Sequence, residues 1–336
     1  MWNHSKRTLT VLTVALAATL LCGSLAMADK PDKPGKPGGG DTAVGTVYFT
    51  YFNIDAGEPL DTWSMGSDGK DKAPLGIGVE GEPSDALHDG ARWFLRQSGA
   101  DLVATSDSGV DVTLEIGDLV LSGGTLRWVG DPGDDPVDPA DDLVDAYVSF
   151  DAELSDGAGA GVYTMPVAFD AVGPLPLDLP TLDVPDGLLN DWNPDGTAAV
   201  CHFFDGLGKW IVDRSGSPLA PLPSGDLFEW SPDGAKIAFR AGDFMNSAIR
   251  TINADGTDEQ TIATAKMRTQ ADGTAFRTGP HWSPGGTHLI FSRSNRKGLK
   301  NEWDVFRVNA DGSGSTNLTR DLETSSAAEA QALAWR

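Results

Sequence analysis

The densest group of potential metal ligands in this sequence is an acidic, proline-rich segment. It carries Asp131, Asp134, Asp135 and Asp138, with two more aspartates close behind. Carboxylate oxygens are the ligands that calcium prefers, so the composition suits a calcium site. The spacing is not that of an EF-hand, because it has neither the glycine at the sixth loop position nor the closing glutamate. The pattern favours a solvated loop, with calcium binding as the alternative.

Apart from His4, the chain has four histidines: His88, His202, His281 and His288. Imidazole nitrogens bind transition metals, and His281 and His288 flank one predicted turn, so both could approach the same ion. No His-x-His or His-Glu-x-x-His pattern accompanies them. The absence of a motif favours structural or surface histidines, with a metal site at His281 and His288 as the alternative.

The sequence offers no convincing nucleophile. Cys201 precedes His202, but neighbours on a strand point to opposite faces, so the imidazole is not placed to activate that thiol. We predict that Cys201 is a small buried hydrophobic residue. No Gly-x-Ser-x-Gly elbow is present. We therefore expect no catalytic residue and no cofactor, and the sequence favours a binding protein over an enzyme.

Short runs rich in β-branched and aromatic residues, separated by Gly, Pro, Asp and Ser, begin at Thr46. They predict strands and turns throughout, and hence an all-β fold. One turn signature recurs three times: Trp-Asn-Pro-Asp-Gly at 192–196, Trp-Ser-Pro-Asp-Gly at 230–234 and Trp-Ser-Pro-Gly-Gly at 282–286. Each copy predicts a hairpin, because proline sets φ at the first corner and the next residues tolerate positive φ.

A second signature follows each hairpin. It reads Val-Asp-Arg-Ser-Gly at 212–216, Ile-Asn-Ala-Asp-Gly at 252–256 and Val-Asn-Ala-Asp-Gly at 308–312. Two hairpins in each repeat predict a four-stranded antiparallel unit. Together the two signatures resemble the repeat of TolB-type β-propellers, also called WD40-like repeats, over 188–336 and more loosely over 46–185. That resemblance implies that each repeat is one blade of a closed ring.

Looser copies extend the pattern into the first half of the chain. Residues 89–95 and 122–129 each resemble a turn followed by the second strand of a blade, and 131–142 reads as an insertion. The run at 292–300 is a basic loop in an acidic protein, and we expect it at a solvated hairpin tip.

The spacing of the repeated tryptophans predicts how the ring closes. Trp335 follows Trp282 by 53 positions, close to the 52 that separate Trp230 from Trp282. We therefore predict a six-bladed β-propeller of four-stranded antiparallel blades, whose C-terminal strand pairs with 46–52 and completes the first blade. The fixed place of these tryptophans, Trp192 included, predicts packing between blades rather than a platform for sugars.

The first residues have the features of an export signal. Lys6 and Arg7 precede an apolar run at 8–21, and Ala-Met-Ala occupies 26–28. We predict a cleaved signal peptide at 1–28, with an uncleaved membrane anchor as the alternative.

A Pro, Gly and Lys tract at 29–45 predicts a disordered tether, which leaves the propeller at 46–336. Cleavage would leave 49 acidic and 23 basic residues, because the leader holds two of the 25 basic ones, and a net charge of about −26. Such a charge repels phosphate backbones and anionic lipids. We expect no nucleic acid or membrane-surface partner, and basic partners or cations are favoured.

TolB is a periplasmic interaction protein with an α/β domain ahead of its propeller, whereas we expect only a short tether before Thr46. The resemblance therefore implies a related propeller, not TolB itself. We predict a periplasmic or secreted monomer, without a membrane span after cleavage, that binds or scaffolds a protein partner. One alternative is a metal-dependent polysaccharide lyase or glycan hydrolase, because oligogalacturonate lyases resemble the same repeats. The other is a small-ligand or calcium-binding propeller.

Overall fold

The computed structural model describes residues 45–53, 58–76, 85–88, 91–106, 108–129, 146–170, 172–203, 208–243, 246–269, 272–276, 278–297, 303–322 and 328–336. These residues form twenty-six strands and one short 3-10 helix, η1 (Arg320–Leu322), and no α-helix occurs among them. They belong to one of two compact units, Thr42–Arg336. The predicted all-β class is confirmed.

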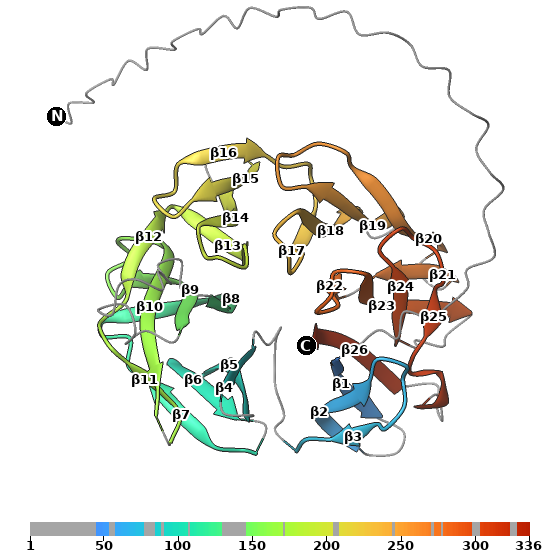
Figure 1. Cartoon of the computed structure of the whole chain (residues 1–336), viewed down its shortest axis with the longest axis horizontal. Helices are drawn as coiled ribbons and strands as arrows, with labels where there is room; N and C mark the ends of the chain where they lie inside the picture. Colours follow the sequence, from blue (N-terminus) through green and yellow to red (C-terminus); the bar gives the residue numbers. More distant parts are fainter. Residues whose placement is uncertain are drawn as a thin grey trace, which may run out of the picture. The chain divides into compact units, whose positions relative to one another are not determined.

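The strands have a β-propeller arrangement, in which sheets succeed one another in chain order around an axis (Figure 1). Three separate sheets come from the first two thirds of the chain. The first contains β4 (Asp85–His88), β5 (Ala91–Ser98), β6 (Asp101–Ser106) and β7 (Asp111–Leu114). The second contains β8 (Leu119–Val129), β9 (Ala146–Leu154), β10 (Gly161–Phe169), β11 (Pro174–Pro176) and β12 (Thr181–Pro185). The third contains β13 (Gly187–Trp192), β14 (Ala198–Phe203), β15 (Gly208–Asp213) and β16 (Pro218–Pro221).

The fourth sheet has thirteen strands and combines the end of the chain with its start. Its first part is β17 (Asp226–Trp230), β18 (Lys236–Gly242), β19 (Asn246–Asn253), β20 (Gln260–Thr269) and β21 (Asp272–Phe276). Its second part is β22 (His281–Trp282), β23 (His288–Lys297), β24 (Trp303–Asn309) and β25 (Thr316–Asn317). Its last part is β26 (Ala328–Trp335), β1 (Thr46–Asn53), β2 (Glu58–Gly66) and β3 (Ala73–Pro74).

Hydrogen bonding thus joins the described strands into four sheets, where the sequence predicted six. Two links account for the large sheet. Strand β21 pairs with β20 on one side and with β23 on the other, so it bridges two groups of strands. A single parallel pair, Trp303 with Glu329, connects β24 to β26. A sheet count based on hydrogen bonds therefore does not equal a count of sequence repeats.

The predicted pairing of the two chain ends is confirmed. Strand β1 lies between β2 and β26, and Val47 is the partner of Trp335. At the end of this pair the backbone N–H of Arg336 donates to the carbonyl oxygen of Thr46, at 2.9 Å. The last strand thus covers an edge of β1 that would otherwise be open to pairing with another chain.

The buried core lies between groups of strands that follow one another around the axis. One cluster joins Ala238 and Ile249 of β18 and β19 to Trp282 and Phe291 of β22 and β23. Five further clusters of the described residues are built in the same way, from neighbouring groups of strands. Each group is too small to bury an apolar face alone, so its stability depends on its neighbours.

The four repeated tryptophans belong to this core. Trp192, Trp230, Trp282 and Trp335 are all buried, each in a different cluster. Indole is a large, flat side chain that removes much apolar area from water when it lies between two sheets. The predicted packing role of these residues is confirmed.

The turns of the first signature have the predicted geometry. In the second copy, Ser231 accepts a hydrogen bond from the backbone N–H of Gly234 at its carbonyl oxygen, at 2.8 Å. Its hydroxyl accepts another from the N–H of Lys236, at 2.9 Å. Gly234 has a φ of 67°, a conformation that costs a residue with a Cβ about 1 kcal/mol or more. Asn193 and Ser283 make the same pairs of contacts in the other copies.

The looser copies give a mixed outcome. Strand β5 begins at Ala91 and pairs with β4, as predicted for a strand that follows a turn. The prediction for residues 122–129 was wrong, because they belong to one continuous strand, β8. Ser122, Gly123 and Gly124 fall where the β8–β9 register shifts, which marks a bulge rather than a turn. The proposed insertion at 131–142 lies outside the described residues.

No helix in the described part of the chain is long and apolar enough to span a bilayer.

Candidate binding site

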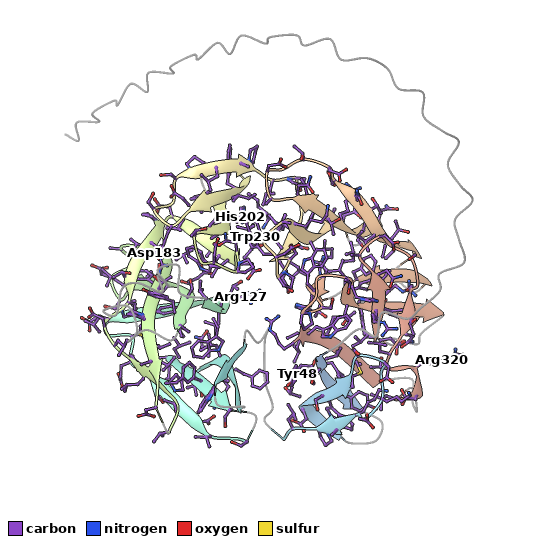
Figure 2. The ribbon with its side chains drawn as sticks, viewed as in Figure 1. Tyr48, Arg127, Asp183, His202, Trp230 and Arg320 are labelled. Carbon is purple, nitrogen blue, oxygen red and sulfur yellow. The ribbon has the colours of Figure 1, made fainter. Side chains whose placement is uncertain are left out.

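A cavity of about 440 Å³ lies among the strands that begin successive repeats. Its walls combine the tryptophan of each copy, the residue immediately before it and the proline of the following turn. The residues before tryptophan are Arg127, Asp191, Glu229 and His281. Arg127 and Trp230 lie on the inner side of the ring, whereas Asp183 and Arg320 lie at its outer rim (Figure 2). The cavity is therefore the feature of the described residues best placed to receive a ligand at the axis.

Strand geometry explains why each tryptophan and the residue before it make different contacts. Successive side chains on a strand point to opposite faces, so tryptophan and its predecessor face different neighbours. Tryptophan faces the preceding group of strands: the indole N–H of Trp282 donates to the carbonyl oxygen of Glu229, at 3.2 Å. The indole N–H of Trp192 donates to the hydroxyl of Ser149, at 2.9 Å. The charged residue before tryptophan contacts the following group at Arg127, Asp191 and Glu229, whereas His281 contacts Glu229 of the preceding group.

Asp191 joins three groups of strands through its two oxygens. Its Oδ1 lies 3.0 Å from Nε of Arg127 on β8, and both side chains are buried. Its Oδ2 accepts the backbone N–H of Trp230 on β17, at 2.8 Å. A buried charge needs such partners, because desolvation without them costs several kcal/mol.

Glu229 repeats this arrangement one step further along the ring. Its Oε1 accepts the backbone N–H of Trp282, at 2.9 Å. Its Oε2 lies 2.6 Å from Nδ1 of His281. Each acid therefore accepts the backbone N–H of the next repeated tryptophan and also contacts a second, basic side chain.

The two acids differ in their response to burial. Burial raises the pKa of Asp191 to about 6, against the opposing effect of Arg127. Burial also acts to raise the pKa of Glu229, but the charge and hydrogen bond of His281 outweigh it and bring that pKa below its ordinary value. Both pKa values lie below 7, so at neutral pH the cavity wall carries ionised carboxylates with partners.

A third buried acid, Asp151 on β9, makes an equivalent connection outside the cavity lining. It accepts the N–H of Leu189 at 2.8 Å and the N–H of Thr125 at 3.2 Å. Burial raises its pKa to about 7, against the smaller opposing effects of these two hydrogen bonds and of Arg127.

The hydrogen bonds described for the His281 and His288 rings have different partners. His281 contacts Glu229, whereas Nδ1 of His288 lies 2.9 Å from the hydroxyl of Thr287. The ring of His288 lies 6.0 Å from that of Trp335. Within the described ranges, no group of three or more potential ligands could hold a metal ion. Metal binding by these histidines stays a prediction.

The other candidates lie partly inside and partly outside the described residues. Asp131, Asp134, Asp135 and Asp138 lie outside the described residues, so calcium binding also stays a prediction. Cys201 is buried, and burial raises the pKa of its thiol far above neutral, as expected for a packing residue.

Sequence reasoning missed Arg127, Asp191 and Glu229. The available signal was a charged residue directly before tryptophan, which recurs at 127–128, 191–192 and 229–230, with histidine in that place at 281–282. The first of these pairs is hidden, because no Pro-Asp-Gly turn follows it.

The sequence has no match among protein-family models and none among curated protein sequences. Solved structures do match. TolB from Acinetobacter baumannii has a TM-score of 0.57 at 16% identity, over 88% of this chain and 67% of its own. A structure described as TolB from Agrobacterium tumefaciens has a TM-score of 0.52 at 17% identity, over 87% of this chain and 98% of its own.

The chain has the fold of the TolB propellers. At these identities the similarity to TolB extends to the fold and not to its partners. An oligogalacturonate lyase from Vibrio parahaemolyticus matches at a TM-score of 0.39 and 10% identity, over 77% of this chain and 70% of its own. That score is too low to support the lyase alternative.

Proposed function

We propose that this chain is an exported β-propeller that binds a protein partner at the mouth of its central cavity. The observation that carries the proposal is the cavity itself, about 440 Å³ in volume and lined by indole rings, prolines and buried charged groups. A concave site of this volume, lined by apolar rings and a few polar groups, has the character of a ligand-binding pocket. The TolB fold adds support by analogy only.

The proposal includes six blades. The thirteen-stranded sheet divides into three groups, and each begins with a strand that ends in a repeated tryptophan, at Trp230, Trp282 or Trp335. Three such groups and the three separate sheets make six units around the axis. The hydrogen bonds of β21 and the single β24–β26 pair join these groups into one sheet, but they do not change the number of repeated units.

We further propose that 1–28 is a cleaved signal peptide, 29–45 a tether and 46–336 the propeller. The protein would act in the periplasm or outside the cell, as a monomer. The support is the leader pattern and the strongly acidic composition, with 49 acidic against 25 basic residues in the whole chain.

Photo-cross-linking in the cells that produce the protein tests the proposed binding site. A photoreactive phenylalanine analogue replaces Pro232 or Pro284, two exposed turn prolines that line the cavity. The matched control places the analogue at Leu219, which is 60% exposed on β16. We expect one adduct of defined mass from both cavity positions and none from Leu219. Equal adducts at all three positions, or none at any, would contradict the proposal.

A further inference from the structure

The outer edge of β10 carries an exposed apolar segment with no role in the site described above. Strands β11 and β12 pair with different parts of β10, and both lie on its outer side (Figure 1). Three leucines at every second position, Leu175, Leu177 and Leu179, are 52%, 43% and 63% exposed. We name these three residues the rim stripe.

In β11 the exposed Leu175 lies between Pro174, which is buried, and Pro176, which is partly buried, while Leu177 and Leu179 flank the exposed Asp178. In an extended chain alternate residues share a side, and Pro174 is buried while Leu175 is exposed. Pro174 and Pro176 pair with Phe169 and Val167 of β10. Two of the three residues of β11 lack an N–H group, which makes its outer edge a poor template for another strand. A partner would therefore bind here through side chains rather than by strand addition.

The apolar exposure is concentrated in this place. Nine large hydrophobic residues of the described part are exposed, and five of them fall between Val172 and Leu182. Scattered exposed leucines need no explanation, but a continuous group on one rim marks an interaction surface. Burying it would release about 25 cal/mol for each Å² of apolar area.

The stretch of sequence that contains the rim stripe carries charge of one sign. Between Arg127 and Lys209 the sequence contains 17 Asp and Glu residues and no Lys or Arg. Asp178 stands between two leucines of the stripe, Asp170 lies five residues before its first leucine, and both are exposed. Hydrogen bonds from the N–H groups of Val172 and of the next residue lower the pKa of Asp170.

The remaining acids at this rim are held by local contacts. Asp178 accepts the N–H of Leu179, at 2.8 Å. Asp183, which Figure 2 places at the outer rim, lies 3.4 Å from Nε of Arg214. Asp170 and Asp178 thus flank Leu175 and Leu177 in the chain, while Arg214 pairs with a different acid, Asp183.

We propose that the rim stripe docks an amphipathic segment of a protein partner, whose apolar face is bordered by lysine or arginine. The leucines receive the apolar face, and Asp170 and Asp178 attract the basic border. A second copy of this chain, with its formal charge of −24, would bring like charges together. Anionic lipid would be repelled for the same reason. The inference concerns a different surface from the central cavity and does not rest on the proposed function.

A labelled synthetic helix of leucine and lysine serves as the probe, with a helix of leucine and glutamate in the same order as its control. The triple variant L175S/L177S/L179S removes the stripe, and L219S removes an equally exposed leucine elsewhere. We expect at least tenfold weaker binding of the lysine peptide to the triple variant and unchanged binding to L219S. Both variants should keep the wild-type melting temperature, because exposed side chains contribute little to the core.

A second pair of measurements tests the charge. In D170N/D178N each side chain keeps an oxygen that accepts the local N–H groups, so the turns should persist. We expect several-fold weaker binding and a weaker dependence on salt. Equal binding by all variants, or equal binding of the leucine and glutamate peptide, would overturn the proposal. So would a wild-type dimer in sedimentation that the triple substitution dissociates, because a second copy would then be the occupant.

Discussion

Both halves of this propeller place a charged residue directly before a tryptophan near the end of a strand. Only in the second half does a turn signature follow that pair and reveal the arrangement in the sequence. In the second half, Glu229 and Trp230 end β17 and a tight Ser-Pro-Asp-Gly turn follows. In the first half, Arg127 and Trp128 stand in the same order one residue before the end of β8 at Val129, and the turn sequence is absent. The charged residue and the tryptophan keep their places, because packing between sheets requires them. The turn can change, because it only has to connect two strands.

The second type of turn also recurs in the first half without its signature sequence. In the second half, the N–H of Gly256 donates to the carbonyl oxygen of Asn253, at 2.9 Å. In the first half, the N–H of Gly157 donates in the same way to Leu154, at 2.8 Å, although no Asn-Ala-Asp-Gly signature is present. The backbone geometry recurs where the sequence has drifted.

The largest effect should come from the tryptophans that occupy equivalent strand ends. Trp335 is fully buried and joins the two chain ends, whereas Trp128 is half-buried. We expect Trp335→Ala to lower the free energy of unfolding by about 3–5 kcal/mol and Trp128→Ala by about 1–2 kcal/mol. Urea unfolding followed by circular dichroism measures both. Equal losses would break the comparison, because the two halves would then be packed to the same degree.

The buried acids should give opposite pH responses. Asp151 has a pKa raised from 3.8 to about 7, so its folded state keeps a proton that the unfolded state loses. Stability from this group therefore falls as pH rises between these values, by up to about 4 kcal/mol. Glu229 has a pKa lowered from 4.5, so its contribution is present above that value and is lost as pH falls below it.

The variants D151N and E229Q separate these effects. Unfolding free energies measured from pH 3 to pH 8 should decline less steeply for D151N than for wild type between about pH 4 and pH 7. E229Q keeps an acceptor for the N–H of Trp282, and it should lose less stability than wild type below about pH 4.5. If both variants flatten the same pH range, the assigned difference between the two acids is wrong.

The smallest effect concerns the turns. Gly234 and Gly157 have φ values of 67° and 79°, and no heavy atom lies closer than 3.6 Å to a Cβ built on either. Substitution by alanine should cost about 1 kcal/mol at each, from backbone strain alone. Gly285 has no positive φ and open space around it, so Gly285→Ala is the matched control and should be neutral. A near-zero cost at Gly157 would show that its positive φ carries less backbone strain than that of Gly234.

Much of the architecture could be predicted from residues that a turn or a strand pairing requires at fixed positions. The turn at Ser231 and Gly234 and the pairing of Val47 with Trp335 follow from signature spacing. The strand β8 did not, because Gly123 and Gly124 resemble a turn and only pairing with β9 makes them a bulge. Tertiary context decides between those outcomes.

The site was less predictable than the fold. Attention to metal-binding residue types singled out His281 and His288 as an alternative site, and His281 does line the cavity, but its partner Glu229 was not foreseen. Contacts between Asp191, Arg127 and Trp230 join residues up to 103 positions apart, from three groups of strands. These contacts depend on the order of the sheets around the axis, which no local sequence pattern specifies.

The pairing of β1 with β26 has a mechanical consequence. Thr46 and Arg336 sit side by side at the same end of an antiparallel pair, whose hydrogen bonds run across the strands. A force that pulls these two residues apart would load those bonds one after another, as in a zipper, instead of all together. Tension between the chain ends would thus open the ring at its seam under a small load, while the strands elsewhere stayed folded.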